Sequence, residues 1–115
     1  MYIQKERKEW MRMKYFSVPV NEEGQRALNS EEDSFYIHDY EMGQDEFERF
    51  VKSGLLHQIN ETCDLTLEEG KRCWISFQQA DQILQLLPGT QFESSEFAGA
   101  LVDAIYFLSG VDCML

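Results

Sequence analysis

Apolar residues recur at helical spacing between residues 91 and 110. Phe97, Leu101, Ile105 and Leu108 mark one face of a helix, and the opposite face carries few polar residues. Gly110 is suited to end this helix. At roughly 14 to 16 residues the helix is too short to span a bilayer. The pattern therefore predicts a buried C-terminal helix, with these four apolar residues in the core.

A second helix is delimited by signals at both ends. Ser76 and Gln79 match the capping box, in which each side chain accepts or donates a hydrogen bond at the first turn. Pro88-Gly89 follows the last apolar position and cannot continue a helix. A helix is therefore predicted over residues 76–87.

A third helix is predicted after Met42-Gly43. Asp45 and Glu48 have the spacing of a capping box in which Asp replaces Ser or Thr. Apolar positions then continue at helical spacing from Phe47 to Ile59. Gly54 interrupts the pattern, and we expect a kink or a close helix contact there.

Period-two alternation predicts the strands. Residues 13–20 and residues 35–40 alternate apolar and polar side chains. Pro19 has no N–H, so it places the first strand at a sheet edge or marks its end. Residues 64–67 and 72–75 flank a Gly-containing turn and are predicted to form a hairpin.

The predicted order of elements indicates an α+β fold. We expect a small, mainly antiparallel sheet packed against three or four helices. The chain has 115 residues, 43% of them hydrophobic, which suits a single globular domain spanning residues 1–115. Residues 1–14 are locally basic and have apolar positions that suit a short helix docked through Trp10.

The charge balance limits the partners. The formal net charge is −11, from 21 acidic and 10 basic residues, whereas nucleic acids and anionic membranes are bound through Lys and Arg. Direct nucleic-acid and membrane binding are therefore not expected.

Three cysteines without CxxC spacing suggest neither a disulfide framework nor a zinc site. The charged N-terminus is no secretory signal, so a reducing cytoplasmic location is expected.

Catalytic signatures are weak. His38 and Asp39 lie beside Tyr40 and Glu41, but neighbours in a strand point to opposite faces and would not converge. The sequence has no glycine-rich phosphate loop, HExxH or GxSxG motif. We expect no enzymatic activity, metal or cofactor.

Two alternatives remain open at this stage. One is a small enzyme or ligand-binding domain that uses His38, His57 or Cys73, for example with an imidazole lowering the pKa of a thiol. The other is a structural or adaptor subunit that associates through its apolar C-terminal helix.

Acidic residues are concentrated in one quarter of the chain. Residues 22–48 contain ten acids and a single basic residue, Arg26. Aromatic residues are interleaved with these acids, as in interfaces with cationic partners. A solvated, solubilising surface is the alternative explanation. The expected partner-binding residues are Glu31, Glu32, Asp33, Tyr36, Asp39, Tyr40, Glu41, Asp45 and Glu46.

This acidic stretch suggests a function by analogy of size and charge. Immunity proteins, antitoxins and nucleic-acid mimics are small acidic proteins that block a basic site on a partner. The sequence therefore predicts a cytoplasmic inhibitor of a basic protein, such as a nuclease toxin. The acids are expected to steer association, and Tyr36 and Tyr40 to anchor the complex.

Overall fold

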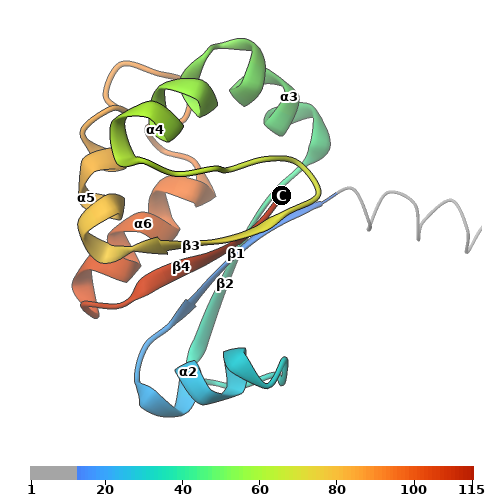
Figure 1. The fold of residues 1–115 in the computed structure, drawn as a ribbon, viewed down its shortest axis with the longest axis vertical. Helices are drawn as coiled ribbons and strands as arrows, with labels where there is room; N and C mark the ends of the chain where they lie inside the picture. Colours follow the sequence, from blue (N-terminus) through green and yellow to red (C-terminus); the bar gives the residue numbers. More distant parts are fainter. Residues whose placement is uncertain (1–12) are drawn as a thin grey trace, which may run out of the picture.

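The structure, a computed structural model, describes residues 13–115. Within this range the chain forms five helices and a four-stranded antiparallel sheet, so the α+β prediction is confirmed (Figure 1). The predicted helix around Trp10 lies outside the described residues. The elements are β1 (Lys14–Pro19), α2 (Glu22–Asn29), β2 (Ile37–Met42), α3 (Gln44–Lys52), α4 (Leu55–Cys63), β3 (Arg72–Ser76), α5 (Phe77–Leu84), α6 (Glu96–Tyr106) and β4 (Gly110–Met114).

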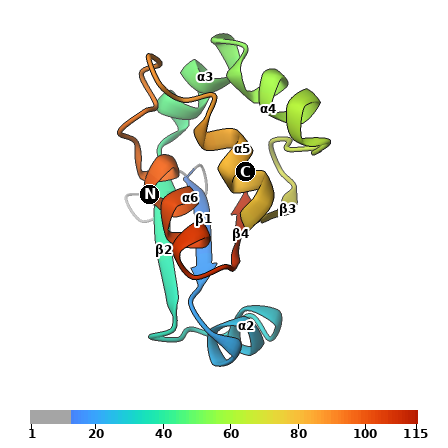
Figure 2. The ribbon, with the colours of Figure 1, turned by 90° about the vertical axis from the view of Figure 1, so that its left-hand side faces the viewer.

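The sheet has the strand order β2-β1-β4-β3. β1 pairs with β2 on one side and with β4 on the other, and β3 pairs with β4. Helices α5 and α6 cover one face of this sheet, while α3 and α4 lie at one end and α2 lies at the opposite end (Figures 1 and 2). None of the helices in residues 13–115 has the length and apolar character needed to cross a membrane.

The core lies between the sheet and helices α3 to α6. Phe16 of β1 packs against Phe97 of α6 with ring centroids 4.9 Å apart and the rings tilted, and Phe50 of α3 meets Phe97 edge-on. Leu101 of α6 and Val111 of β4 are also fully buried. Alternate residues of each strand face this core, so the intervening residues face the opposite side of the sheet.

Helix α6 is buried along one face only. Phe97 and Leu101 are in the core as predicted, and Ile105 is half-buried. The prediction for Leu108 is wrong, because this side chain is 71% exposed. The helix ends at Tyr106, and Leu108 adopts a left-handed backbone (φ 51°) that turns the chain into β4. Its side chain is thereby directed away from the core-facing stripe.

The predicted hairpin is wrong. β3 is present, but its partner is β4, a strand that the sequence analysis did not anticipate. Residues 64–71 form an irregular segment with turns at Asp64 and at Glu69-Gly70, and no strand. Asn60 explains part of this difference, because its side-chain amide donates to the Leu67 carbonyl and its oxygen accepts from the Leu67 N–H. Leu67 therefore needs no strand neighbour to satisfy its backbone.

The helix predicted after residue 42 is divided in two. Gly54 has φ 83° and is the N-cap of α4, so the interruption is a full break between α3 and α4. The capping box predicted at Asp45 is also wrong, since Gly43 is the N-cap and provides no side-chain bond. By contrast, the capping box of Ser76 and Gln79 at the start of α5 is confirmed.

Both period-two strands are present with small shifts. Pro19 ends β1, which is an interior strand and not an edge. β2 begins at Ile37, two residues after the predicted start, and Phe35 before it is almost fully exposed.

Candidate functional site

A row of polar residues crosses the sheet face that is turned away from the core. Ser17 of β1 lies opposite Asp39 of β2 on one side and Asp112 of β4 on the other, and Asp112 lies opposite Trp74 of β3. Their strand neighbours, such as Phe16, point into the core. Strand alternation alone therefore places three polar side chains and one aromatic ring on the outer face of the sheet.

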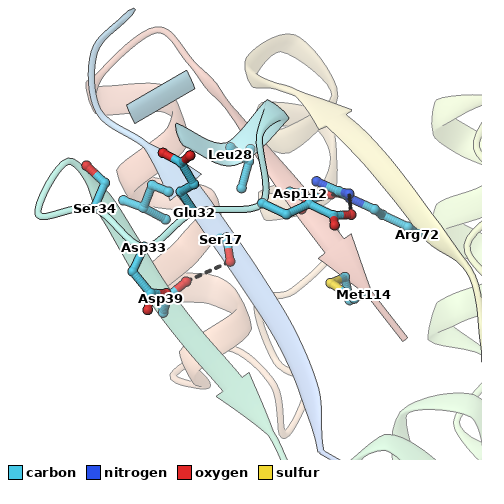
Figure 3. A pocket seen from close by; sticks show the side chains of 11 residues that line it. Ser17, Leu28, Glu32, Asp33, Ser34, Asp39, Arg72, Asp112 and Met114 are labelled. Atoms are coloured by element: carbon cyan, nitrogen blue, oxygen red, sulfur yellow. Dashed lines mark hydrogen bonds and ion pairs between the residues drawn. The ribbon is translucent and has the colours of Figure 1, made fainter. Parts of the chain in front are cut away.

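A hollow of about 580 Å³ lies on this face, beneath α2 and the loop of residues 30–36 (Figure 3). Leu28 of α2 forms part of its wall, and Ser17 lies on its floor. Five carboxylates and one guanidinium line the hollow; these are Glu31, Glu32, Asp33, Asp39, Asp112 and Arg72. The hollow is therefore an acidic concavity, and we refer to these six residues with Ser17 as the acidic hollow.

Asp112 is the most buried of these carboxylates, with a side chain only 7% exposed. Its Oδ1 accepts a 2.7 Å hydrogen bond from Arg72 Nε, and Arg72 Nη1 lies 3.5 Å from Glu31 Oε1. The hydrogen bond and charge of Asp112 raise the pKa of Arg72, so its guanidinium stays charged. This cation therefore compensates a carboxylate that would be costly to bury alone.

Among the described residues, the other three carboxylates of the hollow, Glu32, Asp33 and Asp39, have no such cationic partner. Asp39 accepts a 2.7 Å hydrogen bond from the Ser17 hydroxyl, which is a neutral donor. Within residues 13–115, Glu32 and Asp33 form no salt bridge, and both are exposed. The hollow therefore presents carboxylates that are available to an external cation.

A groove continues from the hollow around α2. A second hollow of about 420 Å³ shares Leu28, Arg72 and Asp112 with the first and extends to Trp74. A third, of about 380 Å³, shares Trp74 with the second and reaches the exposed Leu108. The acidic hollow is thus joined to an apolar end that contains a tryptophan and a leucine.

Four of the predicted partner-binding residues come together in the acidic hollow: Glu31, Glu32, Asp33 and Asp39. Glu41 lies on the same sheet face as Asp39, two residues further along β2. Its charge adds to burial in raising the pKa of Tyr15, which lies opposite in β1.

Tyr36 and Tyr40 are not among the residues that line the acidic hollow. Tyr36 precedes β2, and its carbonyl accepts from the Val20 N–H. Tyr40 faces α6, on the other side of the sheet from the acidic hollow, and its hydroxyl donates to Asp103 over 3.0 Å. Burial, followed by this hydrogen bond, raises the pKa of Tyr40 to about 12. Tyr40 therefore joins β2 to α6 and does not face the carboxylates.

Asp45 and Glu46 are in the first turn of α3, at the end of the molecule opposite α2 (Figure 1). The sequence places them only a few residues after Asp39, but β2 carries the chain across the sheet before α3 begins. They are therefore separate from the acidic hollow in space.

The residues considered for catalysis do not converge. His38 Nδ1 lies 2.6 Å from Asp103 Oδ2, and His57 pairs with Glu61 one turn away on the exposed face of α4. Cys73 is in β3, the edge strand opposite β2. With strands about 4.8 Å apart, three spacings separate His38 from Cys73 by roughly 14 Å. Within residues 13–115 there is also no cluster of three His, Cys, Asp or Glu side chains that could hold a metal.

Arg72, Asp112 and Ser17 were missed by the sequence analysis. The signal for Asp112 is the alternation of Val111, Asp112 and Cys113, in which one polar residue separates two apolar ones. This pattern is short, and it becomes informative only when β4 is known to lie in the middle of the sheet.

Comparisons with known proteins find a similar fold. No protein-family model and no curated protein matches the chain. One solved structure that is similar is the Neisseria DNA mimic protein DMP12, with a TM-score of 0.54 and 13% sequence identity. The similarity covers 90% of this chain and 99% of that protein. At this identity, it shows a shared fold.

Proposed function

We propose that this protein is a small cytoplasmic inhibitor that binds a DNA-binding protein and occludes its basic DNA-binding site. The single observation that carries the proposal is the acidic hollow, which is lined by five carboxylates and by one guanidinium. In this proposal the protein acts by occupying the DNA-binding surface of its partner and not by catalysis. A nuclease toxin is one partner of the expected class.

The charge and the fold support a DNA-mimic mode of action. DNA presents a dense row of phosphate charges, which its protein partners contact with Lys and Arg. Here Asp39 and Glu41 share one face of β2 about 6.8 Å apart, and Glu32 and Asp33 extend the negative surface. The similar fold of a protein that is named a DNA mimic supports the proposal that these carboxylates take the place of phosphates.

The groove around α2 supports a division of roles between charge and packing. Exposed carboxylates raise the rate of encounter with a basic partner and make it salt-dependent. Trp74 and Leu108 offer exposed apolar surface at the other end of the groove. Tryptophan is enriched among binding hot spots, so Trp74 replaces Tyr36 and Tyr40 as the proposed anchor, and Leu108 adds apolar contact.

The test begins with affinity capture of the partner from the native host and measurement of its association rate. A triple variant, Glu32→Lys, Asp33→Lys and Asp39→Lys, reverses charges in the acidic hollow. Its matched control, Asp45→Lys, Glu46→Lys and Glu48→Lys, makes the same change in net charge on α3. We expect the hollow variant to slow association at least about tenfold and to flatten its salt dependence, with a much smaller effect in the control.

Competition with duplex DNA provides the second measurement. DNA should displace this protein from its partner, since both are proposed to occupy one site. Equal effects of the two triple variants would assign the binding to net charge alone. A partner that binds DNA and this protein simultaneously would contradict occlusion.

A further inference from the structure

Two thiols face each other across β3 and β4. Cys73 lies directly opposite Cys113 in the antiparallel register, so both side chains are on the core-facing side of the sheet. Both cysteines are free. Cys113 is buried, whereas Cys73 is half-buried against the core. The third cysteine, Cys63, is on α4 and lies in neither of these strands.

The register gives the separation of the two backbones. The Leu115 N–H donates to the Lys71 carbonyl, which makes residues 71 and 115 a hydrogen-bonded pair. Cys73 and Cys113 lie two residues further along each strand, so they form the next pair of this kind. Their Cα atoms are therefore about 5.5 Å apart. This value lies inside the range of about 4.4 to 6.8 Å that a disulfide spans, close to its commonest value.

A small adjustment would bring the sulfur atoms together. The Cβ atoms of such a pair are about 5.5 Å apart, whereas a disulfide holds them at about 3.5 to 4.5 Å. Cys73 Sγ at present lies 3.8 Å from the Trp74 carbonyl oxygen, so its side chain must also rotate.

The surroundings permit this movement. In the sheet formed by residues 13–115, β3 is an edge strand with a single neighbour, so its approach toward β4 disrupts no second ladder there. On the other side, a small apolar cavity lined by Phe16, Phe97 and Cys113 adjoins the buried thiol.

We propose that Cys73 and Cys113 form a redox-sensitive pair, which closes to a cross-strand disulfide by exchange with a small-molecule disulfide such as oxidised glutathione. The more accessible Cys73 thiolate attacks one glutathione sulfur, forming a mixed disulfide and releasing one glutathione. The Cys113 thiolate then attacks the Cys73 sulfur and releases the second. Two protein thiols are oxidised and one glutathione disulfide is reduced, and the two protons end on the two glutathione thiols.

The second exchange limits the rate. Burial raises the pKa of the Cys113 thiol, with further contributions from Cys73 and Asp112, so little of the attacking thiolate is present. The closed bond requires the strands to approach, and strained disulfides are reduced more easily. The pair is therefore reversible, unlike a structural disulfide. This inference is independent of the proposed function.

The test uses the full chain in its reduced form, incubated with oxidised glutathione under native conditions. Intact mass and peptide mapping after alkylation should show the loss of two hydrogens and a peptide linking Cys73 to Cys113. Cys63→Ser, the matched control, should give the same product. Cys73→Ser, at a half-buried position that tolerates a polar group, should give none. Dithiothreitol should restore the reduced mass.

Circular dichroism before and after oxidation checks that the fold is retained. Three outcomes would overturn the inference: a glutathione adduct on Cys73 that never closes, a bond that includes Cys63, or a disulfide between two chains. Formation of the Cys73–Cys113 peptide only after denaturation would also refute it, because the folded register would then play no part.

Discussion

The pairing of Arg72 with Asp112 gives the sharpest stability prediction. Arg72→Met keeps most of the apolar stem and removes the charge that faces Asp112. The Asp112 side chain is 7% exposed and that of Arg72 is 43% exposed. Breaking a fully buried pair costs about 3 to 5 kcal/mol, and an exposed pair contributes about 0.2 to 1 kcal/mol. Because Asp112 is buried and Arg72 is partly exposed to solvent, the cost should lie between these limits. We expect Arg72→Met to lower the free energy of unfolding by about 1.5 to 3 kcal/mol.

Urea unfolding of Arg72→Met, Asp112→Asn and the double variant would measure this pair as a cycle. The double variant should cost less than the sum of the single variants, with a coupling of about 1 to 2 kcal/mol. Lys71→Met is the matched control, because Lys71 pairs with Glu68 and both are more than 60% exposed. Its cost should stay below about 0.5 kcal/mol. Equal costs for Arg72→Met and Lys71→Met would refute the reasoning and indicate that water satisfies Asp112.

Three further variants test the fold. Leu101→Ala should lower the free energy of unfolding by about 2 to 5 kcal/mol, whereas Leu108→Ala should cost below about 0.5 kcal/mol because that side chain is exposed; equal losses in chemical unfolding would show that the burial of α6 is wrongly assigned. The ordinary pKa of Tyr40 is 10.0 and the fold raises it to about 12, so its contribution to stability is complete below pH 10 and is lost as pH rises through that interval. Tyr40→Phe should lack this loss, and a pH profile of stability identical to that of the native chain would argue against the bond to Asp103.

Local signals were sufficient where neighbours in sequence decide the structure. The capping box of Ser76 and Gln79 requires only one helical turn, and the alternation around Phe16 directly reports which side chains are buried. Four carboxylates of the acidic hollow were also found from sequence, because Glu31, Glu32, Asp33 and Asp39 lie close together in the chain.

Non-local pairing explains what was missed. β4 is short and carries the charged Asp112 at its centre, and that residue is tolerated there because Arg72 approaches from another strand. Leu108 was assigned to the core because the apolar spacing continues past the end of α6. The turn that exposes it is fixed by the start of β4. Tyr40 was grouped with the acids, although strand alternation turns it toward α6.

The position of β4 also determines when the sheet can assemble. Phe16 and Cys113 are partners in neighbouring strands, although nearly the whole described chain separates them. During synthesis, β1 therefore pairs only with β2, and β3 lacks its partner, until residues 110–114 have emerged from the ribosome. Contacts this distant in sequence slow folding, and unpaired strand edges promote aggregation in the interval. A chain stopped before Gly110 would retain the acidic residues of the 30–36 loop and of β2, but it would lack Asp112 and the strand that joins β1 to β3.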